Sequence, residues 1–162
     1  MADFEIAVAK TLRAEGGDKV TDDPNDAGGL TKYGISQRAY PNTNIRGLTE
    51  DNAKGIYRRD YWNPVRGDEI SNQRIAETLF DFAVNAGVKT AIRICQHIIG
   101  VAPDGVMGGV TVRKLNEMSD DLFLAVFALS KIARYVAICR KNPEQKKFLF
   151  GWVSRSLEGI VS

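Results

Sequence analysis

Histidine and cysteine, the side chains that most often bind transition metals, are scarce in this sequence. Its 162 residues include one histidine, His97, and two cysteines, Cys95 and Cys139, with no C-x-x-C pair. An ordinary structural zinc site needs four such ligands close together, so we expect neither a metal nor another cofactor. Both cysteines lie in apolar stretches of helical character, which predicts buried free thiols rather than a disulfide.

A long uninterrupted apolar run is also absent. The longest mostly apolar stretch, residues 122–139, is interrupted by Lys131 and Arg134, and so falls short of the span that a membrane helix needs. The first ten residues, MADFEIAVAK, carry acids where a secretory signal would carry basic residues. We therefore expect a chain that starts in the cytoplasm and does not insert stably into a membrane.

The sequence has no strong excess of one charge. Its 22 basic and 20 acidic side chains leave a formal net charge of +2. The basic residues are scattered, which is not typical of a nucleic-acid-binding protein. Residues 1–81 carry 11 Lys/Arg against 14 Asp/Glu, and residues 82–162 carry 11 against 6. The C-terminal half would thus favour contact with an anionic polymer, although a solvated helix face explains the same charges.

Hydrophobic residues make up 44% of the chain and charged residues 26%, as in ordinary globular proteins. Apolar spacing, helix caps and glycine stops predict a mainly α fold, with a polar, glycine-rich segment after the first helix that is irregular or forms a small β-hairpin. The expected helices cover residues 4–15, 49–62, 75–86 and 91–99, a short one capped by Thr111, residues 119–140, and a last one that opens at Asn142-Pro143.

Glu15 is the most informative residue of the first helix. It continues the face formed by Phe4, Val8 and Leu12, so its carboxyl group is expected to point toward the core or a cleft. A carboxylic acid in such a place can serve as the general acid of glycoside cleavage. Asp22, Asp23, Asp26 and Thr31 follow within one connection. Taken alone, a glutamate at a helix end followed by acidic loop residues is more often a capping or ion-pair arrangement.

Two longer strings resemble a known family. Glu15-Gly16-Gly17 is followed by D-P-N-D-A-G-G-L-T-K-Y-G-I at residues 23–35. This pattern resembles glycoside hydrolase family 108, the N-acetylmuramidases found mostly in phages and prophages, and departs from it at Asp18, where that family usually has tyrosine. The string D-F-A-V-N-A-G at residues 81–87 and the ending F-L-F-G-W-V-S-R at 148–155 resemble the predicted peptidoglycan-binding lobe that is joined to these enzymes.

The resemblance implies roles for six residues. Glu15 matches the family's essential glutamate and would act as the general acid, with Asp26 as second carboxylate and Thr31 as the residue that positions a water. Asp23 is a rival for the second carboxylate and, with Tyr33 and Asn85, a candidate substrate contact. Turn formation explains Asp23 and Asp26 as well, and Asn85 could instead tie two helices together.

The resemblance also implies an organisation and a setting. We expect a lysozyme-like fold in which residues 1–70 form the catalytic lobe and residues 71–162 a peptidoglycan-binding lobe, packed as one compact unit. The implied activity is hydrolysis of the β-1,4 bond between N-acetylmuramic acid and N-acetylglucosamine. The implied setting is phage lysis, in which the enzyme waits in the cytoplasm for a holin-type partner and then acts on the wall from the periplasm. A lytic transglycosylase and a non-catalytic peptidoglycan-binding module are the alternatives.

Overall fold

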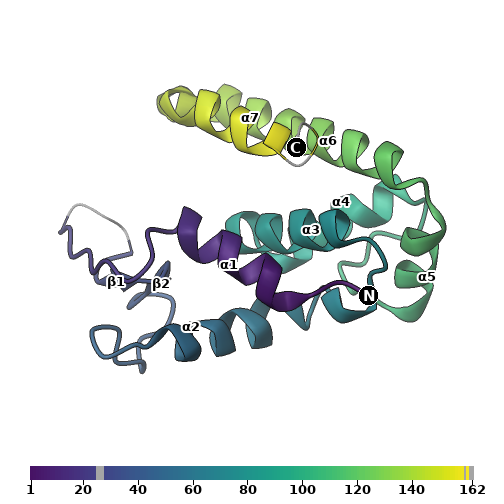
Figure 1. Cartoon of the computed structure of the whole chain (residues 1–162). Helices are drawn as coiled ribbons and strands as arrows, with labels where there is room; N and C mark the ends of the chain where they lie inside the picture. Colours follow the sequence, from purple (N-terminus) through teal and green to yellow (C-terminus); the bar gives the residue numbers. More distant parts are fainter. Residues whose placement is uncertain (25–27, 159, 161–162) are drawn as a thin grey trace.

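The fold is mainly helical, as predicted (Figure 1). A computed structural model describes residues 1–24, 28–158 and 160. Within that part of the chain, helices surround one small antiparallel sheet, in which Thr31 pairs with Ser36 and Lys32 with Ile35. The elements are α1 (Phe4–Ala14), β1 (Thr31–Lys32), β2 (Ile35–Ser36), α2 (Glu50–Tyr57), the π-helical η1 (Arg58–Trp62), the 3-10 helix η2 (Gly67–Glu69), α3 (Gln73–Ala86), α4 (Val88–Ile98), α5 (Gly109–Glu117), α6 (Asp120–Lys141), the 3-10 helix η3 (Pro143–Phe148) and α7 (Leu149–Glu158).

Side-chain caps set the start of several helices. The hydroxyl of Thr49 accepts a hydrogen bond from the Asn52 N–H at 3.2 Å at the start of α2, and Ser119 accepts one from the Leu122 N–H at 3.5 Å at the start of α6. Such caps satisfy amides that have no partner within the helix. The predicted starts at Thr49 and Ser119 are therefore confirmed.

The predicted cap at Thr111 is wrong. α5 begins at Gly109, so Thr111 lies inside its first turn, where it is buried. Its hydroxyl is the partner of the Gln96 side-chain amide from α4, at 3.4 Å. A buried amide needs hydrogen-bond partners, and the Thr111 hydroxyl is one partner of the buried Gln96 amide. This contact joins two helices, so the local sequence does not reveal it.

The helices pack in layers around α3. In Figure 1, α6 and α7 run along one side of the molecule and α2 along the other, with α1, α3 and α4 between them. Trp62 is fully buried and packs edge-on against Phe80 and tilted against Phe4, with ring centroids 5.6 Å apart in both pairs. Its indole N–H donates to Asp68 at 2.8 Å. The core is continuous from α1 through α3 and α4 to α6.

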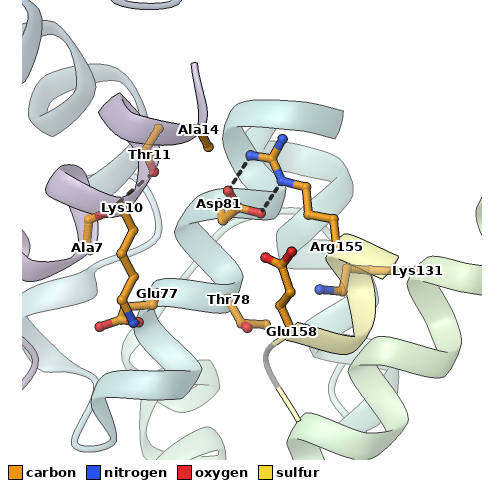
Figure 2. Close-up of a pocket in the computed structure, with 10 residues that line it drawn as sticks. All are labelled: Ala7, Lys10, Thr11, Ala14, Glu77, Thr78, Asp81, Lys131, Arg155 and Glu158. Atoms are coloured by element: carbon orange, nitrogen blue, oxygen red, sulfur yellow. Dashed lines mark hydrogen bonds and ion pairs between the residues drawn. The ribbon is translucent and has the colours of Figure 1, made fainter. Parts of the chain in front are cut away.

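Helix α6 differs from the expectation for residues 122–139. Among the described residues, it is the one helix that is long and apolar enough to cross a membrane by length and composition alone, and 33% of its apolar stretch is buried. The core helices of water-soluble proteins can meet the same criterion. Lys131 is a charged residue within the apolar stretch of the continuous helix α6. It points toward α3 and α7 (Figure 2), and its ammonium lies 5.4 Å from the centre of the Phe127 ring.

The packing around Trp62 predicts the effect of a single added methyl group. A Cβ at Gly67 would lie 2.3–2.6 Å from ring atoms of Trp62, so Gly67→Ala should lower the free energy of unfolding by about 1–3 kcal/mol. Gly55→Ala is the matched control, because a Cβ there meets nothing within 4 Å. In the exposed face of α2 it should raise stability by about 0.5–1 kcal/mol. Urea unfolding measures both, and a Gly67→Ala protein as stable as the wild type would contradict this packing.

Candidate active site

Glu15 lies where α1 ends. Its N–H still donates to the main-chain oxygen of Thr11 at 2.9 Å, and the chain then turns away through Gly16 and Gly17, whose φ angles are +90° and +61°. Only glycine adopts such angles readily. The Glu15 side chain is 28% exposed, so its carboxyl group is held by the protein and is still accessible to a ligand.

The turn of the β-hairpin packs directly against the stem of Glu15. A Cβ at Gly34, whose φ is +75°, would lie 2.8 Å from the Glu15 Cβ and 2.5 Å from the Tyr57 hydroxyl. No larger residue fits there without displacing one of them. Gly34 therefore allows the hairpin backbone to fix the lower part of the Glu15 side chain.

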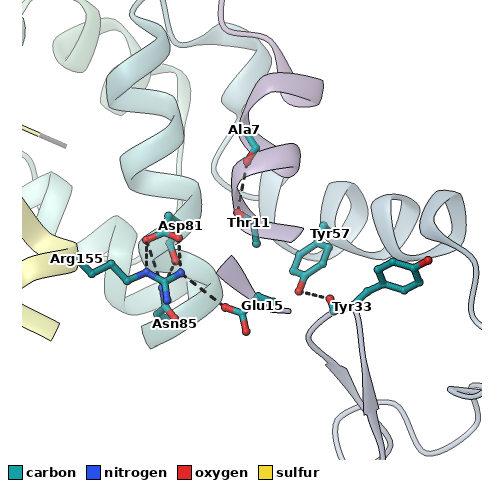
Figure 3. Close-up of polar contacts among 8 residues, drawn as sticks. All are labelled: Ala7, Thr11, Glu15, Tyr33, Tyr57, Asp81, Asn85 and Arg155. Atoms are coloured by element: carbon teal, nitrogen blue, oxygen red, sulfur yellow. Dashed lines mark hydrogen bonds and ion pairs between the residues drawn. The ribbon is translucent and has the colours of Figure 1, made fainter. Parts of the chain in front are cut away.

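Tyr57 joins the hairpin to α2 beside Glu15. Its hydroxyl donates to the main-chain oxygen of Tyr33 at 2.9 Å (Figure 3), and its side chain is almost fully buried. Burial raises the pKa of the Tyr57 phenol far above its ordinary value, and the charge of Glu15 adds to this effect. Tyr57 is thus a permanent hydrogen-bond donor in this site.

The opposite side of Glu15 is formed by the C-terminal helix. Arg155, on α7, donates two hydrogen bonds to the carboxylate of Asp81 on α3, at 2.7 and 3.3 Å. The same guanidinium lies 3.7 Å from the Glu15 carboxylate (Figure 3). Burial lowers the pKa of Arg155, but the hydrogen bond and charge of Asp81, together with Glu15, raise it by more. Arg155 therefore stays charged, with Asp81 as its main counter-ion.

The structure brings some of the predicted residues together. Asn85 lies next to this cluster, since its amide donates to the main-chain oxygen of Asp81 at 2.8 Å. Its contacts among the described residues go to Asp81 in the same helix and do not link α3 to another helix. The main chain of Tyr33 reaches the site, but its ring points away from Glu15 (Figure 3).

The remaining candidates lie in or near the hairpin. Thr31 pairs with Ser36 in the sheet, and its hydroxyl bonds to the main-chain oxygen of Gly29 at 3.2 Å. Asp23 lies on the exposed segment that precedes the hairpin. Asp26 lies outside the described residues. The roles expected of Asp23, Asp26 and Thr31 stay predictions.

Sequence reasoning did not assign Asp81 and Arg155 to the site. Both belong to strings that carried the family resemblance, which was the available signal, but neither has a local pattern that connects it with Glu15. No group of three or more His, Cys, Asp or Glu side chains suited to a metal ion occurs among the residues that the structure describes. The arrangement that is present, an accessible carboxyl group with a fixed stem, suits proton transfer to a bound ligand.

Comparisons with known proteins divide the chain into two parts. Residues 8–87 match the model of the family described as Glycosyl hydrolase 108, and residues 90–157 match a Predicted Peptidoglycan domain. Among solved structures, the chain is similar to that of Brucella abortus SagA, with 27% sequence identity, a TM-score of 0.74, and coverage of 98% of this chain and 96% of that one. No curated protein matches the chain.

The contact between Gly34 and Glu15 predicts a difference between two glycine substitutions. Gly29 and Gly34 both have positive φ, +65° and +75°, so alanine is strained at either position. Only at Gly34 does the added Cβ also meet other atoms within 4 Å. Gly34→Ala should therefore lower the free energy of unfolding by about 1 kcal/mol or more beyond the loss in Gly29→Ala. Equal losses in urea unfolding would mean that the hairpin does not pack on Glu15 as described.

Proposed function

Because residues 8–87 belong to the glycosyl hydrolase 108 family and a predicted peptidoglycan domain follows them, this chain is a glycoside hydrolase that acts on peptidoglycan, and we propose that it is a lysozyme. The proposed reaction is hydrolysis of the β-1,4 bond between N-acetylmuramic acid and N-acetylglucosamine. The observation that supports it most is the position of Glu15, which is accessible at the end of α1 while elements from three parts of the chain restrain its side chain.

In this proposal Glu15 is the general acid. It gives its proton to the glycosidic oxygen as the bond to the sugar breaks, and this avoids an unstable alkoxide leaving group. Efficient transfer requires that the carboxyl group point at one atom of the bound glycan. The packing of Gly34 against the stem of Glu15 supports such a fixed direction.

Arg155 and Asp81 act as positioning residues in this scheme. The guanidinium approaches Glu15 from α7, but its two hydrogen bonds go to Asp81. Asp81 therefore balances much of the positive charge that Glu15 would otherwise face. Since both oxygens of Asp81 bind Arg155, we leave the role of second carboxylate to Asp26 or Asp23, with Thr31 as the residue that positions the water.

The proposed setting rests on the family resemblance alone. It is phage or prophage lysis, with the enzyme held in the cytoplasm until a holin-type partner allows it to reach the wall. Tyr33 and Asn85 are proposed to contact the glycan, Tyr33 through its main chain and Asn85 through the part of its amide that Asp81 leaves accessible.

Two alternatives predict different products. A lytic transglycosylase also uses one acidic residue but closes the sugar on itself, which leaves anhydro-muramic ends, and a binding module leaves the glycan intact. Digestion of purified peptidoglycan followed by mass spectrometry of the fragment ends separates the three functions. We expect reducing muramic acid ends, whereas anhydro ends would identify a transglycosylase.

Replacement of the Glu15 carboxyl group by an amide should abolish most of the hydrolytic activity. Glu15→Gln keeps the size of the side chain but cannot protonate the leaving oxygen, so turnover should fall by about 10²-fold or more. The matched control is Glu5→Gln on the same helix, where the carboxylate pairs with Lys54 at 3.0 Å and activity should not change. Thermal unfolding verifies that both variants fold. Clearance of cell walls by Glu15→Gln at the wild-type rate would exclude Glu15 as the acid.

Alanine substitutions distinguish Asp26 from Asp23. Alanine in place of the second carboxylate should lower turnover without a large shift in the melting temperature of the protein. Alanine in place of an aspartate that only forms a turn should lower the melting temperature and leave most of the turnover. The two variants are compared in wall-clearance assays and thermal unfolding. Small and equal activity losses in both would leave Thr31 as the remaining candidate for positioning the water.

A further inference from the structure

A cavity lies beside the proposed acid, on the other side of the Arg155–Asp81 ion pair. It has a volume of about 290 Å³ and is formed by α1, α3, α6 and α7 (Figure 2). Ligand pockets usually measure about 300–1,000 Å³, so this cavity suits a small end group better than a glycan chain. We refer to it as the α6 pocket; its charged side chains are Lys10, Glu77, Asp81, Lys131, Arg155 and Glu158.

The charges of the α6 pocket balance, but the ion pairs do not include all of them. Lys10 forms an ion pair with Glu77, and Arg155 forms one with Asp81. Of the described side chains around the pocket, this leaves one cation, Lys131, and one carboxylate, Glu158, for which neither a hydrogen bond nor an ion pair is found.

Lys131 is unusual because it is buried without such a partner. The residue is 5% exposed, and its ammonium faces the rings of Phe127 and Phe82, 5.4 and 6.0 Å from their centres. Burial lowers the pKa of Lys131. The negative charges of Asp81 and Glu158 partly oppose this decrease, and the positive charge of Arg155 adds to it. Taking an ammonium out of water costs free energy that aromatic rings alone offset poorly, so a carboxylate from a ligand would satisfy an existing need.

Glu158 supplies the complementary group at the edge of the pocket. It is the last residue of α7 and is exposed, and in Figure 2 its carboxylate lies on the same side of the pocket as Lys131 and Arg155. A ligand that brought only a carboxylate would meet Lys131 and also the negative charge of Glu158. A ligand with an ammonium beside its carboxylate would pair with both.

We propose that the α6 pocket binds the side-chain end of the diamino acid in a peptidoglycan stem peptide, where a free ammonium and a free carboxylate share one carbon, with the carboxylate at Lys131 and the ammonium at Glu158. This rests on the proposed function, because the pocket shares Asp81 and Arg155 with the site of Glu15. The stem peptides of a glycan strand are attached close to its sugars, so a strand that lies across Glu15 brings a stem peptide near the α6 pocket. Binding of that peptide in the pocket would make the enzyme favour strands that still carry their peptides. The pocket thus determines which wall the enzyme prefers.

The test compares two substrates from one peptidoglycan preparation: glycan strands with their stem peptides, and the same strands after an amidase has removed the peptides. We expect the wild type to have a kcat/KM about tenfold higher on the peptide-bearing strands, as one charged contact can provide. Lys131→Met and Glu158→Gln should each lower that value to the level of the peptide-free strands. Acetylation of the free amines of the stem peptides should lower the kcat/KM of the wild type on these strands by the same factor. It should cause no further decrease in Glu158→Gln.

Lys141→Met is the matched control, since Lys141 is an exposed lysine on the same helix as Lys131 and does not line the pocket, so this variant should keep the wild-type preference for peptide-bearing strands. Thermal unfolding reports on the fold of each variant, and Glu158→Gln, at an exposed position, tests the proposal even where Lys131→Met is unstable. Equal losses on both substrates, or no loss on either, would overturn it.

A wild-type protein that cleaves neither substrate would overturn the proposed function and not this inference. Isothermal titration calorimetry with a disaccharide peptide, and with the same disaccharide without its peptide, then decides the matter. Tighter binding of the peptide form that is lost in Glu158→Gln supports the α6 pocket as the binding site, and equal binding of the two probes overturns it.

Discussion

The ion pair between Arg155 and Asp81 connects the last helix to the part of the molecule that carries Glu15. Helix α7 otherwise packs mainly on α6 and η3, which precede it directly in the chain. The two hydrogen bonds from Arg155 to Asp81 span 74 residues of sequence and fix where α7 lies relative to α3. A planar guanidinium bound at two points has little freedom to turn, so this pair also sets the position of the positive charge beside Glu15.

A second constraint acts on Glu15 from the hairpin. The backbone at Gly34 and the hydroxyl of Tyr57 occupy the space on one side of its stem, and the guanidinium of Arg155 stands on the other. These three neighbours come from the hairpin, from α2 and from α7. Each is held by its own contacts, such as the bond from Tyr57 to the Tyr33 oxygen. A side chain restrained in this way needs little reorganisation before it transfers a proton.

The features that sequence predicted are those that depend on nearby residues. The end of α1 just before Gly16 and Gly17 and the caps at Thr49 and Ser119 follow from local chemistry and are confirmed. Thr111 was misassigned because its hydroxyl serves a buried amide from another helix. Asp81 and Arg155 were missed for a similar reason, since only the folded chain brings them to Glu15. Lys131 and Arg134 lie within residues 122–139, but they do not take α6 below the length and apolar composition of a membrane-spanning helix.

The long separation between Asp81 and Arg155 has a consequence for the order of synthesis. The ribosome makes Glu15 and the hairpin early, whereas the helix that carries Arg155 is added after all the others described here. An unfinished polypeptide therefore contains the proposed acid without the guanidinium beside it or the wall that α7 contributes to the α6 pocket. Translation that stops before residue 155 therefore yields a fragment in which neither the surroundings of Glu15 nor the α6 pocket is complete.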